Sequence, residues 1–151
     1  MEESPIIICR SNEAFSKSEI AKILDACAQD FPHSIGSTLL NREDIVEKLY
    51  SNAHWILSYD AKNSLIGFIA YYVNPIHKFF YIPYAWVNQK SRRIHCGTNM
   101  MQELKRQMQS NIQEIRLEVR KDNSAAIDFY QRNGFVVSEN RLDKFLLVYK
   151  N

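Results

Sequence analysis

A chain of 151 residues with 46% apolar and 24% charged residues is long enough to enclose one hydrophobic core and too apolar for a disordered protein. Its formal net charge of +2 is too small to suggest that the whole surface binds nucleic acid, so a positive patch has to be local. We therefore expect a single globular domain over residues 1–151.

The N-terminus and the cysteines indicate a cytoplasmic protein. Residues Met1 to Pro5 include two glutamates and lack the basic and apolar regions of a signal peptide, and no apolar run is long enough to cross a bilayer. Cys9, Cys27 and Cys96 are far apart and form no C-x-x-C pair, which is typical of reduced thiols. The four histidines lack the spacing of zinc ligands, so we expect no metal.

In the first part of the chain, the apolar pattern predicts a strand, two helices and an antiparallel meander of three strands. The expected elements are, in order, a strand at 6–9, a helix from Ser18 to near Pro32, a helix capped by Asn41, and strands at 54–59, 65–73 and 79–87. Pro83 lies inside the last of these strands, where it cannot donate a ladder hydrogen bond, so we expect a bulged or interrupted pairing there.

The rest of the chain predicts two more helices and three more strands. These are a helix that begins near Gly97, a strand at 115–119, a helix from Asn123 to the stop signal Asn133-Gly134, and strands at 135–137 and 145–149. The order predicts an α/β domain with a mixed, mostly antiparallel sheet of about seven strands, flanked by about four helices.

A positively charged segment connects the strand that ends at Val87 to the helix that begins near Gly97. It contains Lys90, Arg92 and Arg93. The N–H groups at a helix start are unpaired and attract anions, and a glycine there lets a pyrophosphate approach the main chain. Taken by itself, the segment is explained more simply as a solvated basic loop.

A longer motif follows, from Leu117 to Phe135, with the sequence LEVRKDNSAAIDFYQRNGF. It closely resembles the L-x-V-x-x-x-N-x-x-A-x-x-F-Y-x-x-x-G-F signature of the GNAT superfamily of N-acetyltransferases. The upstream Arg92-x-x-His95-x-Gly97 resembles the coenzyme A loop of that family. The resemblance implies a GNAT-like fold and an acyltransferase that uses acetyl-CoA as a co-substrate to acetylate a primary amine.

The same resemblance implies the residues that bind acetyl-CoA. They are Ala85, Trp86 and Val87 for the pantetheine arm, Arg92, Arg93, Ile94, His95, Cys96, Gly97 and Thr98 for the pyrophosphate, and Asn123, Ala126 and Tyr130 near the thioester. Positions 123, 126 and 130 share one helix face, whereas Phe129 points elsewhere and is assigned to the core. His95 stands where the family usually has glycine, so its side chain either crowds the phosphate or donates to it. Cys96 is interpreted as an incidental small residue rather than a nucleophile.

Acetyl transfer to an amine needs a base, because an alkyl ammonium has a pKa of about 10 and only the free amine attacks a thioester. The resemblance implies Glu118 as this base. A salt bridge between Glu118 and Arg116 or Arg120 is the alternative explanation of its charge. Tyr130 is implied as the acid that protonates the leaving thiolate when the tetrahedral intermediate collapses.

The acceptor is expected to be a small-molecule amine that contacts His33, Ser34, Tyr72 and Tyr84, although such residues are also common in ordinary packing. Two alternatives stay open: acetylation of a protein N-terminus or lysine, and a non-catalytic CoA-binding module. Nucleic-acid binding through Lys90, Arg92, Arg93, Lys105 and Arg106 lacks the interleaved aromatics that stacking needs. We expect no nucleic-acid or membrane partner, and a monomer or homodimer.

Overall fold

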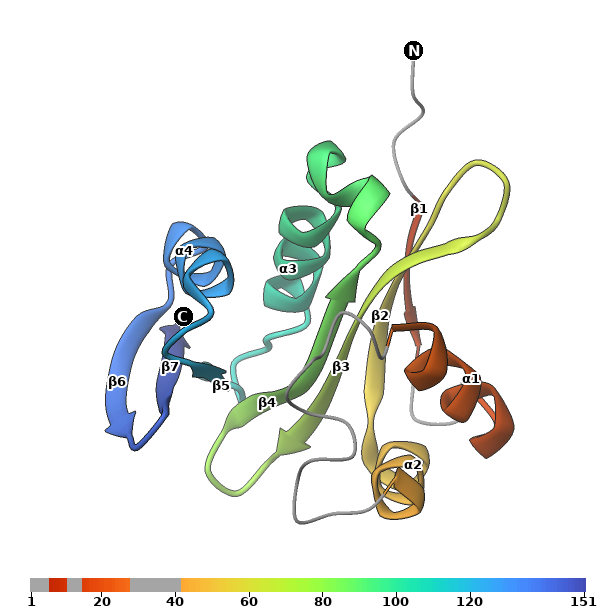
Figure 1. Cartoon of the computed structure of the whole chain (residues 1–151). Coiled ribbons are helices and arrows are strands. Elements are labelled where there is room, and N and C mark those ends of the chain that lie inside the picture. Colours follow the sequence, from red (N-terminus) through yellow and green to blue (C-terminus); the bar gives the residue numbers. More distant parts are fainter. Residues whose placement is uncertain (1–5, 11–14, 28–41) are drawn as a thin grey trace.

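The computed structural model describes residues 6–10, 15–27 and 42–151, and these form seven strands, four α-helices and one 3₁₀ helix (Figure 1). The elements are β1 (Ile6–Arg10), α1 (Lys17–Cys27), α2 (Arg42–Asn52), β2 (His54–Tyr59), β3 (Leu65–Asn74), β4 (Phe79–Val87), η2 (Gln89–Ile94), α3 (Cys96–Arg106), β5 (Glu114–Arg120), α4 (Ser124–Arg132), β6 (Val136–Arg141) and β7 (Lys144–Lys150). The predicted order and the α/β class are confirmed.

The strands form one mixed sheet in the order β1-β2-β3-β4-β5-β7-β6. β1 to β4 pair in antiparallel fashion, as do β5, β7 and β6, and the two groups meet through a parallel pairing of β4 with β5. Helices α1 and α2 cover one face of the sheet, and α3 and α4 lie on the other (Figure 1).

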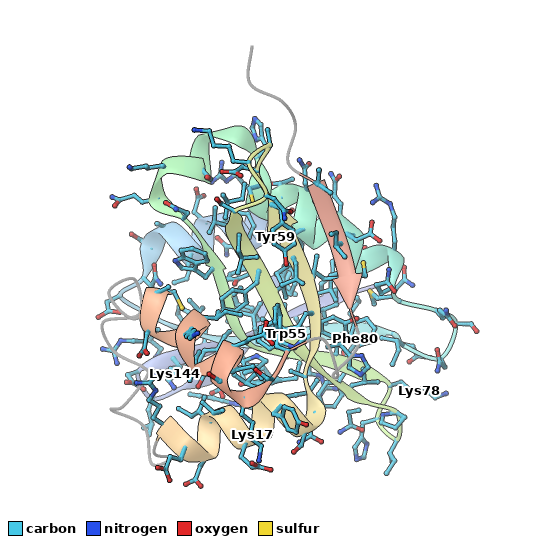
Figure 2. The ribbon with its side chains drawn as sticks, turned by 90° about the vertical axis from the view of Figure 1, so that its right-hand side faces the viewer. Lys17, Trp55, Tyr59, Lys78, Phe80 and Lys144 are labelled. Carbon is cyan, nitrogen blue, oxygen red and sulfur yellow. The ribbon has the colours of Figure 1, made fainter. Side chains whose placement is uncertain are left out.

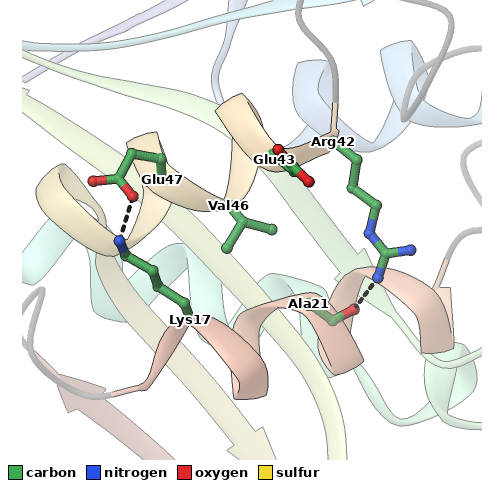
Figure 3. A pocket seen from close by; sticks show the side chains of 6 residues that line it. All are labelled: Lys17, Ala21, Arg42, Glu43, Val46 and Glu47. Carbon is green, nitrogen blue, oxygen red and sulfur yellow. Dashed lines mark hydrogen bonds and ion pairs between the residues drawn. The ribbon is translucent and has the colours of Figure 1, made fainter.

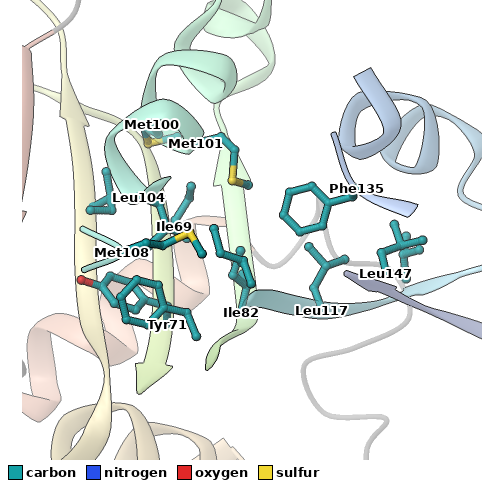
Figure 4. Packing of buried hydrophobic residues seen from close by; sticks show 14 of the residues in the cluster. Ile69, Tyr71, Ile82, Met100, Met101, Leu104, Met108, Leu117, Phe135 and Leu147 are labelled. Atoms are coloured by element: carbon teal, nitrogen blue, oxygen red, sulfur yellow. The ribbon is translucent and has the colours of Figure 1, made fainter. Parts of the chain in front are cut away.

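Strand alternation divides the apolar residues between two cores, because successive side chains point to opposite faces of a sheet. On β2, Trp55 and Leu57 pack toward α1 and α2, while Ile56 packs toward α3. Figure 2 shows Trp55 between α1 and the sheet, and Figure 4 shows Met101 of α3 above the other face. Burial on both faces explains why the central strands read as nearly continuous apolar runs.

The predicted irregularity at Pro83 is confirmed. Ala70 of β3 pairs with Tyr84, but Tyr72 pairs with Tyr81, so β4 carries one residue more than β3 over this step. The extra residue shifts the alternation, since Tyr81 and Tyr84, three positions apart, now lie on the same face. The bulge therefore gathers polar aromatic side chains on the α1–α2 side of β4.

Two elements differ from the prediction. β6 extends to Arg141 rather than ending at residue 137, because its last residues are polar and fully at the surface and leave no apolar pattern. The 3₁₀ helix η2 was not predicted. Pro32 and Asn41 lie outside the described residues. Among the described helices, none is long and apolar enough to cross a bilayer.

Candidate functional site

The parallel strands β4 and β5 separate soon after they meet. They pair over three residues, Phe79–Tyr81 with Glu114–Arg116. Beyond that point β4 stays paired with β3 and β5 with β7, so in the described part of the chain no strand pairs with the β5-facing side of 82–87 (Figure 1). Main-chain groups on such an edge are able to bind an extended ligand that carries amide groups.

The helix α3 begins beside the upper end of this gap. η2 precedes it and is capped by Asn88, whose side chain accepts a hydrogen bond from the Lys90 N–H at 3.0 Å. The first helical bond of α3 runs from the Asn99 N–H to the His95 carbonyl at 2.9 Å. The N–H groups of residues 96–98 precede that bond and lack acceptors within the helix, so they form an end that attracts anions.

The residue at the junction of η2 and α3 has a left-handed backbone. His95 has φ of 59° and ψ of 26°, and its side chain is exposed. This conformation costs an L-residue free energy but costs glycine none. That is a physical reason why glycine is usual at the matching position of the family that the motif resembles. Arg92, Arg93 and Ile94, also expected in the phosphate loop, belong to η2.

Behind the start of α3, two neighbouring residues have different surroundings. The Cys96 thiol is buried and burial raises its pKa, so it is not an activated nucleophile, and its main-chain N–H is the group left for a phosphate. Gly97 faces α4: a Cβ there would lie 3.2 Å from Cε2 and Cζ of Phe129. Thr98 follows on α3 and is half-buried.

Phe129 was assigned to the core from the sequence, but its half-buried ring joins α4 to the start of α3 and also contacts Tyr130, with 5.2 Å between ring centroids. This places it beside the expected pyrophosphate position. The signal available in the sequence was its spacing in the motif: 129 is three positions after Ala126, so the two are neighbours on the helix surface, and the assignment of Phe129 to another face overlooked this.

Helix α4 begins as predicted. The Asn123 side chain accepts a hydrogen bond from the Ala126 N–H at 3.2 Å, so it caps the helix. Gly134 at φ of 92° follows the end of the helix, as expected of a stop signal. Tyr130 packs against Phe135, with 5.4 Å between centroids, and burial raises the pKa of its phenol to about 12. The phenol therefore stays protonated at neutral pH and is a hydrogen-bond donor.

Glu118 lies on β5 just beyond the last residue paired with β4. The hydroxyl of Tyr81, on β4, donates to Oε1 of Glu118 at 3.2 Å, so this bond spans the point where the two strands diverge. Burial, followed by the Glu118 charge, raises the pKa of Tyr81 to about 12. Nothing in the sequence pattern marked Tyr81, because its position depends on the bulge.

The cation next to Glu118 is not the one expected. Arg116 pairs with Glu114 at 2.7 Å, and Arg120 pairs with Asp122 and Asp143 at 3.3 and 3.1 Å. Instead, Nη1 of Arg141 on β6 lies 3.7 Å from Oε2 of Glu118. The alternative of a local salt bridge along β5 is therefore wrong, since neighbouring carboxylates take both arginines.

Two of the four expected acceptor contacts lie on the same face as Glu118. Tyr72 is the cross-strand partner of Tyr81, and Tyr84 follows the bulge; both are half-buried, and burial raises the pKa of each phenol. The Lys48 ammonium lies 5.0 Å from the centre of the Tyr72 ring. The other two expected contacts, at positions 33 and 34 (His33 and Ser34), lie outside the described residues.

The gap between β4 and β5 has functional groups on both faces of the sheet. Tyr130 packs on the α3–α4 side, next to the core that contains Leu117 and Val119. Glu118 lies between these two residues on β5 and so points to the opposite face. Of the expected β4 contacts, Ala85 and Val87 pack toward α3 and Trp86 toward α1 and α2. A ligand in the gap would have a donor on one side and a carboxylate on the other.

A hollow of about 420 Å³ lies elsewhere, between α1 and α2 (Figure 3). It is lined by Lys17, Ala21, Arg42, Glu43, Val46 and Glu47. Lys17 pairs with Glu47 at 2.5 Å, and Nη2 of Arg42 donates to the Ala21 carbonyl at 3.0 Å, so these groups join the two helices. We assign this hollow to helix packing. Within the described ranges, no group of three or more His, Cys, Asp or Glu side chains is placed to hold a metal ion.

Comparison with known proteins agrees with this geometry. The family model of the acetyltransferase (GNAT) family matches residues 18–135. No curated protein sequence matches the chain. Among solved structures, a PaiA N-acetyltransferase from Thermoplasma acidophilum in complex with coenzyme A is 19% identical, covers 97% of this chain and 99% of its own, and superposes with a TM-score of 0.72.

Two further structures show the same fold at similar identity. NAA60 from Arabidopsis thaliana, in complex with a bisubstrate analogue, is 16% identical, with 96% of this chain and 98% of that chain covered and a TM-score of 0.71. A dodecameric spermidine N-acetyltransferase from Vibrio cholerae is 17% identical, with 95% and 93% covered and a TM-score of 0.68. The family match spans most of the chain, and the protein therefore belongs to the GNAT family of acetyltransferases.

Proposed function

We propose that this protein transfers the acetyl group of acetyl-CoA to a primary amine of a small molecule. The observation that carries the proposal is the divergence of β4 and β5, with Tyr130 on one face of the gap and Glu118 on the other. Acetyl-CoA supplies the acetyl group as an activated thioester.

The residues present fit such a co-substrate. Residues 85–87 of β4 lie beyond its pairing with β5 and are suited to contact the amide groups of the pantetheine arm, and the N–H groups at the start of α3 are suited to a pyrophosphate. Gly97 leaves the main chain there without a side chain, and the Phe129 ring of α4 lies beside it. The similarity to a structure that holds coenzyme A supports this assignment.

Glu118 is the proposed base. At pH 7 only about 0.1% of an amine with a pKa near 10 is unprotonated, so a carboxylate that accepts the proton at the site accelerates attack. Tyr81 donates to one carboxylate oxygen and so orients Glu118 toward the gap. Tyr130 is the proposed acid: its phenol remains protonated, and it donates its proton to the departing thiolate.

Thermal unfolding with and without acetyl-CoA tests the cofactor assignment. A ligand at about a hundred times its dissociation constant adds roughly 2.7 kcal/mol, which raises the melting temperature of a chain this size by roughly 5–10 °C. No shift at millimolar acetyl-CoA would overturn the proposal. Release of thiol from acetyl-CoA with a panel of amines and short peptides then tests turnover and separates small-molecule from protein acceptors.

A matched pair of variants tests the base. Glu118→Gln keeps the size of the side chain and removes the proton acceptor, so kcat is expected to fall by about 10²-fold or more while acetyl-CoA still shifts the melting temperature. Glu114→Gln, on the same strand, is the control and is expected to retain most activity, since its carboxylate pairs with Arg116 rather than reaching Glu118.

A further inference from the structure

Arg141 contacts two carboxylates, Glu139 and Glu118, and its contact with Glu118 is the longer one. Nε of Arg141 donates to Oε2 of Glu139 at 2.6 Å, within the same strand. Its Nη1 lies 3.7 Å from Oε2 of Glu118, beyond hydrogen-bond distance. Arg141 is therefore held by its hydrogen bond to Glu139, while its Nη1 lies near Glu118 without a hydrogen bond.

The two oxygens of Glu118 also differ. Oε1 accepts the hydrogen bond from Tyr81, while Oε2 faces the guanidinium of Arg141. Among the described residues, Arg116 and Arg120 of β5 form ion pairs with other carboxylates. The β7 residue opposite Glu118 is the apolar Leu146. Oε2 is thus the oxygen that an incoming ammonium would meet, and the guanidinium of Arg141 already lies beside it without a hydrogen bond.

We propose that Arg141 is the specificity-determining residue of the acceptor site. Its guanidinium occupies the place that the acceptor's ammonium takes at Glu118, and it selects against acceptors with a second positive charge. This inference rests on the proposed acetyl transfer to an amine and on Glu118 as the base.

Displacement from Glu118 does not remove Arg141 from the site, because Glu139 continues to hold it. Its positive charge stays within a few ångströms of the bound amine, well inside the screening length of about 8 Å at physiological salt. Lys48, above Tyr72, adds a second positive charge on the same face. The acceptor class that fits is a primary amine whose neighbouring group is neutral or anionic, rather than a diamine or polyamine.

The test uses three acceptors of equal chain length: an alkyl monoamine, an ω-amino carboxylate and an α,ω-diamine. For the unmodified protein we expect kcat/KM to be lowest for the diamine. In Arg141→Gln, the ratio of kcat/KM for the diamine to that for the amino carboxylate is expected to rise about tenfold, mostly through KM.

Arg106→Gln is the matched control, because it removes an arginine from an exposed ion pair with Glu103 on α3, away from the gap. Its acceptor ratio is expected to equal that of the unmodified protein. If Arg141→Gln is folded and active but leaves the ratio unchanged, the inference is wrong while the acetyl transfer stands. If the unmodified protein acetylates no amine, the proposed function itself fails.

Discussion

At the scale of single residues, Tyr130 provides the sharpest test of the chemistry. Tyr130→Phe keeps the ring contacts with Phe129 and Phe135 and removes the hydroxyl, so the melting temperature and acetyl-CoA affinity are expected to change little. If the phenol protonates the thiolate, kcat falls by about 10²-fold. Steady-state kinetics and ligand titration of the same preparation separate the two effects. Loss of affinity with unchanged kcat would assign Tyr130 to binding instead.

The raised pKa of Tyr130 also predicts a pH dependence. The acid is active in its protonated form, and burial shifts the loss of that form from about 10 up to about 12. The contribution of this phenol to kcat is therefore expected to persist through pH 10 and to fall only as the pH approaches 12. A kcat profile that falls near pH 10 in the unmodified protein, and flattens in Tyr130→Phe, would contradict this.

His95 offers a test of backbone strain at the phosphate loop. At an ordinary helical position alanine is more stable than glycine by about 1 kcal/mol. At φ of 59° the order reverses, because the left-handed backbone costs an L-residue about 1–2 kcal/mol. Glycine loses more chain entropy on folding, which offsets part of this cost, so we expect His95→Gly to melt about 2–4 °C above His95→Ala. Equal melting temperatures would show that the loop relaxes around the substitution.

At the scale of elements, Lys105 connects three of them. From the last turn of α3, its Nζ donates to the Asn133 carbonyl at the end of α4 and lies 4.2 Å from the centre of the Tyr149 ring on β7. Burial lowers the pKa of this ammonium. Because the Lys105 ammonium already has these partners, it is not available to a nucleic-acid phosphate. This argues further against nucleic-acid binding through the basic residues.

Removing this connection is expected to destabilise the α3–α4 side. Lys105→Met keeps most of the aliphatic stem but loses the hydrogen bond and the cation–π contact, at a cost of about 1–2 kcal/mol. The melting temperature is expected to fall by about 2–8 °C. The neighbouring Arg106→Met is the control, because its exposed ion pair with Glu103 contributes little. Equal effects of the two variants would remove the assigned role of Lys105.

The sequence predicted the elements best where burial left a strong pattern. The bounds of β2 and β4 were predicted to the residue, because both of their faces are buried and turn residues mark their ends. β6 was predicted too short, because its outer half is polar and at the surface. Arg141 lies in the part of β6 that was not predicted, so its contact with Glu118 could not be predicted from the sequence.

Contacts across the gap were hard to predict for a different reason. Tyr81 and Glu118 are far apart in the sequence, and their contact depends on a parallel pairing of three residues and on a bulge. The motif predicted Tyr130 and Glu118 as site residues, but a pattern of residues carries no information on the register between strands. The proline marked the bulge, yet not which side chains it would bring together.

At the scale of the whole molecule, the gap divides the sheet into two parts joined by a short parallel pairing and the shared core. One part is the meander β1–β4, and the other is β5, β6 and β7 with α4. A ligand that pairs with β4 and contacts α3 and α4 would bridge them. Because strand edges and helix starts open easily, binding is expected to protect these segments from amide exchange more than the rest of the chain.

Hydrogen exchange read by mass spectrometry measures this directly. With saturating acetyl-CoA, peptides that cover 82–99 and 123–130 are expected to exchange several-fold more slowly, whereas peptides from β1 change little. β1 is the internal control, since it lies at the edge of the sheet on the far side of β2, β3 and β4 from the gap. Protection spread evenly over the chain would indicate global stabilisation by a ligand bound elsewhere, and protection confined to the α1–α2 side would move the cofactor site away from the β4–β5 gap.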